Sequence, residues 1–256
     1  VLTVYRPPEA GFLVGPKVSR LPHFTEVRIE HLADDDLRAL AVAKLRALQR
    51  VDDRVPPADD LLDLVCGRAE GNPFYVEELV NYLDDRGIDT SSPDALRQVQ
   101  LPDSLHSLIL GRIDQLTEDQ RTLLKVASVI GRLFQAAMLW GVHRPSDGAA
   151  SPGDPAARQR LLDRLVEHDL TTVDSPEPEL AYLFKHVLTQ EVAYETLAFA
   201  TRAVLHEEIG RYIETHRTAQ IEQHLDLLAH HYDRTENLPK RREYLGRAGA
   251  AASAAS

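Results

Sequence analysis

The chain has 256 residues, and its 40 acidic side chains outnumber its 29 lysines and arginines, giving a formal net charge of −11 at pH 7. This acidity disfavours binding to nucleic acid or to an anionic membrane surface, because a negative field repels phosphate. A single cysteine excludes an internal disulfide, and no apolar run approaches the roughly 18 residues of a membrane span, so we expect a cytoplasmic chain without membrane contact.

The first segment predicts the end of a sheet. Residues 1–5 (VLTVY) are β-branched and aromatic and are followed by two prolines, which is typical of a short buried strand. Val27 and Ile29 lie on one side of a second short strand predicted over 25–29. Two strands do not form a stable sheet by themselves, so we expect the other strands to lie outside this chain. The chain also ends in an alanine-rich run, and we therefore expect a piece of a longer protein.

A small all-helical unit is predicted next. Three aspartates, 34–36, offer an N-cap and a favourable charge at the start of the first helix. Gly71 ends a second helix, the dipeptide Asn72-Pro73 starts a third, and Gly87 closes it. A linker follows this unit.

Three further helices and a β-hairpin are predicted in the middle of the chain. Helix, helix, helix, hairpin is the order of a winged-helix domain. The expected elements are helices starting after Ser104 and after Thr117, a helix over 158–168, and strands over 170–173 and 180–184.

The last part of the chain is predicted to be helical. Helices over 187–199 and 202–215 precede a helix that ends near Tyr232 and another that starts near Lys240. With alanines at packing positions, this last pair resembles the start of a tetratricopeptide-type array, which is an α-solenoid.

Common catalytic and metal-binding motifs are absent. The sequence holds no GxxxxGK[ST] phosphate loop and no HExxH, GxSxG or CxxC motif. His230 and His231 are adjacent and do not have the spacing that a shared metal ion needs on a helix. We therefore predict no catalytic residue and no metal ligand in this chain.

The segment 71–79 (GNPFYVEEL) admits two interpretations. By local physics it is a corner between two helices. It also resembles the GxP motif in the lid of signal-transduction ATPases related to AAA and NB-ARC proteins, whose proline packs on the adenine of bound nucleotide. The resemblance implies that Gly71, Asn72 and Pro73 contact ATP or ADP.

Two other segments resemble the same family. VLTVYRPPE (1–9) resembles the strand after the Walker B strand, which implies that Arg6 senses phosphate; a solvated arginine is the alternative. FKHVLTQEVAYETL (184–197) resembles the end of the winged helix, where the histidine of an MHD-like motif faces the β-phosphate. This implies that His186 contacts nucleotide, although Val187 replaces the family's aspartate. The alternative is a histidine that caps the next helix under the hairpin.

Longer segments narrow the resemblance. Residues 101–134, 181–214 and 230–252 resemble the ATPase-plus-repeat region of large bacterial adenylate/guanylate cyclase domain-containing proteins. In those proteins a class III cyclase domain precedes an AAA-type ATPase, a winged helix and tetratricopeptide repeats. The likeness implies a mainly α fold in four parts: a partial α/β nucleotide-binding core over 1–33, a helical lid and linker over 34–100, a winged-helix-like domain over 101–200, and the start of the repeats over 201–256.

The resemblance also implies a function and partners. The chain would couple a repeat sensor, which binds a protein partner, to a cyclase output. Mg²⁺ would be held by the part of the ATPase core that lies outside this chain. Two alternatives remain open, namely the middle of a LuxR-type transcription regulator and a protein-interaction scaffold without a nucleotide role.

DNA binding by the winged helix is not expected. In the candidate recognition helix, 156–170, three arginines are balanced by three acidic residues. The hairpin carries Asp174, Glu177 and Glu179, which would face phosphate with like charge.

Overall fold

A computed structural model describes residues 23, 25, 27, 29–48, 57–90, 92, 95–96, 100–143 and 154–254. The described residues are mainly helical with one small antiparallel sheet, which confirms the predicted mainly α class. No helix among them is long and apolar enough to cross a membrane. The strand predicted over 1–5 lies outside the described residues.

The second predicted strand is wrong where the structure describes it. Residues 25, 27 and 29 have no strand structure, and the side chains of Val27 and Ile29 are 79% and 90% exposed. Alternation alone does not make a strand, because the backbone also needs a neighbouring strand to bond.

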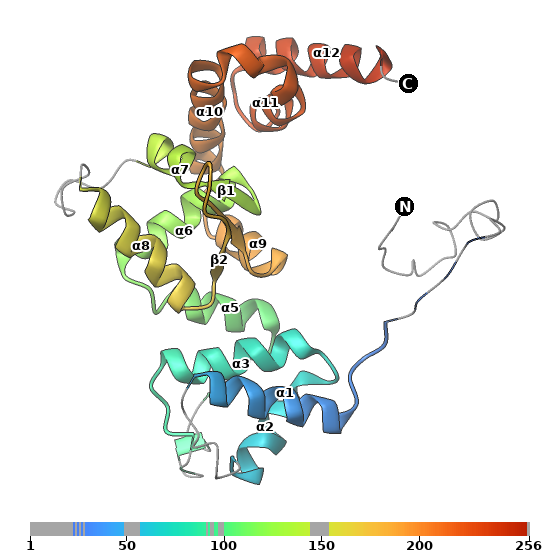
Figure 1. The fold of residues 1–256 in the computed structure, drawn as a ribbon, viewed down its shortest axis with the longest axis vertical. Coiled ribbons are helices and arrows are strands. Elements are labelled where there is room, and N and C mark those ends of the chain that lie inside the picture. The colour runs from blue at the N-terminus through green and yellow to red at the C-terminus, as the bar shows by residue number, and fades with distance from the viewer. Residues whose placement is uncertain are drawn as a thin grey trace.

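The region predicted to be a lid contains three helices, at the lower end of Figure 1, and these helices are called the lid below. They are α1 (Asp34–Ala47), α2 (Asp59–Ala69) and α3 (Pro73–Asp85). The three aspartates lie in the first turn of α1, where they complement the helix dipole, but the N-cap is Ala33 and no side chain caps it. Buried apolar side chains of all three helices form one core, which reaches Leu108 of the following helix.

The region predicted to be a winged-helix domain follows in the middle of the molecule and is called the winged-helix unit below (Figure 1). Its predicted helices and hairpin are confirmed, and Thr117 and Gln120 form a reciprocal capping box at the second helix. The elements are α5 (Leu105–Ile113), α6 (Glu118–Ile130), β1 (Leu133–Gln135), α7 (Ala136–Val142), α8 (Pro155–Glu167), β2 (Thr171–Ser175) and β3 (Ala181–Phe184).

Sequence reasoning did not find β1 and α7. β1 has three residues, of which only Phe134 is fully buried, so no alternating pattern develops. It is fixed instead by pairing with β3, which lies between β1 and β2 in the sheet. Tertiary pairing therefore decides this strand.

The rest of the chain is helical. Its helices are α9 (Val187–Glu195), α10 (Phe199–His216), the 3₁₀-helix η1 (Thr218–His224), α11 (Leu225–Tyr232) and α12 (Leu238–Ala254). Helix α9 lies beside the sheet in the middle of the molecule, and the helices after it lead to the upper end (Figure 1). The last pair agrees with the predicted positions, whereas the break between the two preceding helices lies near residues 196–198, earlier than expected.

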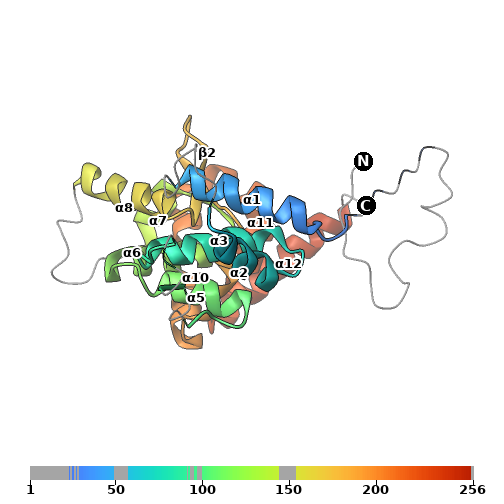
Figure 2. The same ribbon diagram turned by 90° about the horizontal axis from the view of Figure 1, so that it is seen from below.

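The described apolar residues form two large cores. The first belongs to the lid, and the second runs without interruption from α5 through the sheet to α12. Tyr232 of α11 and Tyr244 of α12 stack within this second core with ring centroids 5.2 Å apart. The winged-helix unit and the repeat-like helices therefore share one interior. Seen from below, the lid helices lie in front of the rest (Figure 2).

Candidate functional site

The corner between α2 and α3 is built by backbone geometry. Glu70 and Gly71 both have positive φ angles, 48° and 83°, which turn the chain out of α2. Asn72 is the N-cap of α3, and its Oδ1 accepts a hydrogen bond from the Phe74 backbone N–H at 3.0 Å. Pro73 occupies the first helical position, where its missing N–H costs nothing. Helix geometry thus accounts for the conformation of Gly71, Asn72 and Pro73.

Gly71 is also required by a close contact. A Cβ atom at this position would lie 2.5 Å from the Cβ of His31, and the carbonyl of Gly71 accepts a hydrogen bond from the Leu32 N–H at 3.0 Å. The corner is therefore fixed against the segment that leads into α1.

His186 lies against this corner. Its ring and that of Phe74 have centroids 3.7 Å apart with an interplanar angle of 32°. His186 is the N-cap residue of α9, as the capping alternative predicts, but its side chain makes no capping hydrogen bond. The imidazole contacts the lid because His186 lies just after the end of β3, and this end of the hairpin faces the lid.

Four of the five candidate residues meet at one junction. Pro73 is exposed and is followed directly by Phe74, whose ring packs against that of His186. Gly71 and Asn72 form the turn beside it. Arg6 lies outside the described residues.

A carboxylate lies between a lysine and a histidine at this junction. Oε2 of Glu77 is 3.5 Å from Nε2 of His186, an ion-pair distance, and 3.3 Å from Nζ of Lys185. The neighbouring His186 and then Lys185 lower the pKa of Glu77, against the opposing effect of its partial burial.

The junction fits a nucleotide in part. Exposed Pro73 and the Phe74 ring provide the apolar surface that an adenine needs. Lys185 and His186 provide groups that attract phosphate, but Glu77 already contacts both of them. A phosphate at this place has to compete with that carboxylate.

Sequence reasoning missed a second group of charges beside the first. Asp169 follows α8 in the left-handed region, with φ 57°. Its Oδ2 accepts hydrogen bonds from Lys44 and Lys185, each at 2.6 Å, and from Asn81 at 3.1 Å. Although burial opposes ionisation, Lys185 and Lys44 lower the pKa of Asp169 to about 2. Lys44 and Asn81 belong to the lid, so Asp169 joins the two units.

Arg112 of α5 makes a third, fully buried connection. Its side chain is 1% exposed and donates to Glu78 at 2.6 Å, to Asp85 at 2.8 Å and to the carbonyl of His168. Burial opposes its charge, but Glu78 and Asp85 raise the pKa of the guanidinium. A sequence signal exists, because Arg112 lies four residues after Leu108 on the apolar stripe of its helix.

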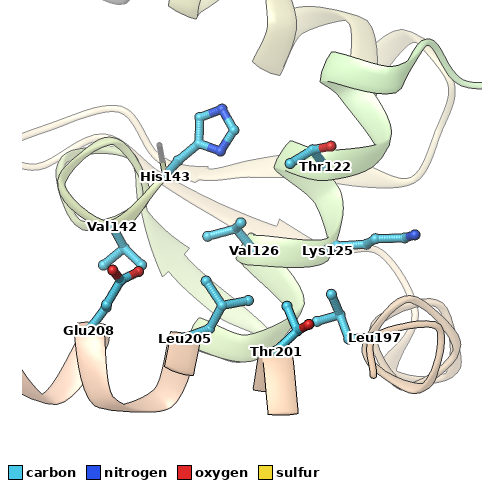
Figure 3. A pocket seen from close by; sticks show the side chains of 9 residues that line it. All are labelled: Thr122, Lys125, Val126, Val142, His143, Leu197, Thr201, Leu205 and Glu208. Atoms are coloured by element: carbon cyan, nitrogen blue, oxygen red, sulfur yellow. The ribbon is translucent and has the colours of Figure 1, made fainter. Parts of the chain in front are cut away.

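A separate cavity of about 260 Å³ lies between α6 and α10, near the end of α7 (Figure 3). Its lining is apolar at Val126, Val142 and Leu205, and more polar at Lys125 and Glu208. It shares no lining residue with the junction, so it is not part of the predicted nucleotide site.

The histidines do not form a metal site. Among the described residues, no group of three or more His, Cys, Asp or Glu is arranged to hold a metal ion. His231 is completely buried, and its Nδ1 lies 2.9 Å from Nδ1 of His206.

Comparison of the chain with protein-family models and with curated proteins finds no match. What the site does must therefore be inferred from its geometry and from the sequence resemblance.

Proposed function

We propose that this chain is the regulatory segment of a multidomain, ATP-dependent signalling protein. Its lid and winged helix sense ATP or ADP and couple the repeat-like helices to a class III adenylate/guanylate cyclase output. The observation that carries this proposal is the contact between Phe74 and His186. It brings together two segments, 71–79 and 184–197, that resemble nucleotide-contacting motifs of one family.

Each group has a distinct task in this proposal. Pro73 supplies an apolar surface for the adenine, and His186 approaches the β-phosphate. The bound nucleotide brings phosphate charge that the winged helix can detect, while Mg²⁺ and the remaining phosphate contacts belong to an upstream ATPase core in the same cytoplasmic protein. The repeat-like helices bind a protein partner.

Calorimetric titration with ADP tests the proposal. In the complete protein we expect His186→Ala to weaken ADP binding about tenfold, the usual loss for one hydrogen bond to a charged group. Pro73→Ala removes apolar contact and should also weaken it, whereas His106→Ala, at an exposed histidine, should not. The 256-residue chain alone should bind ATP weakly. Unchanged ADP affinity in both site variants, or tight Mg²⁺-dependent ATP binding by the chain alone, would contradict the proposal.

A scaffold without a nucleotide role is the second candidate. It is favoured by the corner itself, because the cap of Asn72 and the contact of Gly71 with His31 explain these residues without a ligand. The same titration separates the two candidates, since a scaffold predicts no effect of either variant on ADP affinity.

We do not assign DNA binding to this winged helix, and a LuxR-type regulator would need its DNA-binding domain elsewhere. Two of the three arginines of α8 have acidic partners within the chain, since Arg160 lies 3.6 Å from Asp154 and Arg164 lies 2.5 Å from Glu167, and Arg158 lies over the ring of Trp140. Together with the acidic hairpin loop, these pairs leave little free positive charge for phosphate.

A further inference from the structure

The boundary between the lid and the winged-helix unit is rich in charge. The two apolar cores meet at α5, because Leu108 of this helix lies in the lid core, and charged and polar side chains make further contacts between the two units. From the lid they are Lys44, Glu77, Glu78, Asn81 and Asp85, and from the winged-helix unit they are Arg112, His168, Asp169, Lys185 and His186.

Asp169 is the shared partner of two lysines from opposite sides of the boundary. Lys44 comes from α1 of the lid, and Lys185 comes from the end of β3. Both ammonium groups lie 2.6 Å from the same carboxylate oxygen, so they are within about 5 Å of each other. The carboxylate is what allows two positive charges to come so close.

Loss of the Asp169 charge would replace an attraction at this contact by a repulsion between the two lysines. Without it, Lys44 and Lys185 would repel each other as like charges, and of the described residues only Glu77 would still offset the charge of Lys185. The side chains of Asp169, Lys44 and Lys185 are 27%, 13% and 30% exposed, so water reaches them once the units part. These partly exposed charges regain water and lose little on separation, whereas removing Leu108 from the lid core or Arg112 from Glu78 would be costly.

We propose that Asp169 is a positioning residue that holds the lid and the winged-helix unit in one orientation. Neutralising its carboxylate opens the boundary around Lys44 and Lys185, while Leu108 and Arg112 of α5 stay in contact with the lid and act as the pivot. Because Lys185 directly precedes His186, separation also withdraws His186 from Phe74. Only this last consequence for nucleotide sensing rests on the proposed function; the separation itself does not.

Pulsed EPR distances between two spin labels test the proposal without any nucleotide. The labels are attached at Asp60→Cys in α2 and Glu191→Cys in α9, two exposed positions, while Cys66 is buried and stays unlabelled. We expect one narrow distance distribution in the otherwise unaltered chain. Asp169→Asn, which keeps the size and tolerates the left-handed backbone, should give a longer and broader distribution with unchanged helical circular dichroism.

Two further variants make the test specific for charge. Asp174→Asn removes the same charge from an exposed position on β2 and should leave the narrow distribution unchanged. Lys44→Met combined with Asp169→Asn removes the repulsion and should restore the narrow distribution.

An unchanged distribution in Asp169→Asn would overturn the proposal, as would a double variant that stays open. If Asp169→Asn does not fold, the double variant decides: a folded, narrow state supports the proposal, and an unfolded one overturns it. Because no nucleotide is present, failure here leaves the proposed function untouched.

Discussion

At the scale of single residues, Glu77 contacts the groups that would attract a bound anion at the junction. Its carboxylate contacts both Lys185 and His186, the two groups of this corner that attract phosphate. The carboxylate stays ionised because these neighbours lower its pKa. The negative charge of Glu77 therefore already interacts with the groups that a bound phosphate would need.

Removing this charge should favour nucleotide. In the complete protein we expect Glu77→Gln to strengthen ADP binding several-fold, because the phosphate no longer competes with a carboxylate for Lys185 and His186. Calorimetric titration of ADP measures the change. Asp60→Asn, at an exposed lid carboxylate, is the matched control. Equal or weaker ADP binding by Glu77→Gln would show that the carboxylate does not compete for this position.

At the scale of elements, the corner between α2 and α3 depends on a glycine. Gly71→Ala puts a Cβ on a residue with φ 83° and 2.5 Å from the Cβ of His31. We expect a loss of about 1–3 kcal/mol in the free energy of unfolding of the lid. Urea unfolding followed by circular dichroism measures it.

A second glycine of the same region supplies the control. Gly67 lies inside α2, and a Cβ there would meet nothing within 4 Å. Gly67→Ala should therefore be neutral or stabilising by up to about 1 kcal/mol, since alanine favours helix more than glycine does. Similar destabilisation by both substitutions would show that the left-handed turn is not the cause.

Local signals predicted the helices well because they act within a few residues. Asn72 and Pro73 start α3, Gly87 follows its end with positive φ, and Thr117 caps α6. The three-residue strand β1 gave no such signal, because pairing with β3 fixes it. Sequence reasoning finds elements whose cause is local and misses those whose cause is a distant partner.

The candidate site divides in the same way. The segments that contain Pro73 and His186 were predicted separately, by resemblance, but nothing in the sequence placed Phe74 under the imidazole. The charged boundary was not predicted: Arg112 lies on the apolar stripe of its helix, but nothing in the sequence shows that its partner is Glu78, which is far away in the chain. Such pairs become visible only when the helices are packed.

At the scale of the whole molecule, the second core contains a buried pair of histidines. The hydroxyl of Tyr194 lies 3.1 Å from Nε2 of His206, and the Nδ1 atoms of His206 and His231 are 2.9 Å apart. Burial is the main reason that the pKa of His206 falls to about 4 and that of His231 to about 2. Both rings are therefore neutral at pH 7.

Acid should destabilise this core before the lid. An unfolded histidine takes up a proton near pH 6.5, so the stability from the neutral pair is complete above that pH and is lost as the pH falls from 6.5 toward 4. At pH 5 we expect a loss on the order of 2 kcal/mol for each ring. Differential scanning calorimetry at pH 7.5 and pH 5.0 should show the transition of the second core moving more than that of the lid.

Variants assign this pH effect to the histidines. His231→Phe removes one titrating ring and should reduce the difference in melting temperature between the two pH values. His106→Phe, at an exposed position, should leave that difference unchanged. If His231→Phe keeps the whole difference in melting temperature between the two pH values, groups other than His231 cause the acid sensitivity.

Helix α10 connects the last two helices to the sheet. Its 18 residues extend about 27 Å along α6 and α7 and lead to α11 (Figure 1). At its C-terminal end, Arg217 donates hydrogen bonds to Gln135 of β1 and to Glu179 in the loop of the hairpin, at 2.8 Å and 2.7 Å. A partner that rotated α11 and α12 would therefore also rotate α10, which is hydrogen-bonded to the sheet. The motion would reach the β2–β3 hairpin, which precedes His186, although the partner does not contact the hairpin.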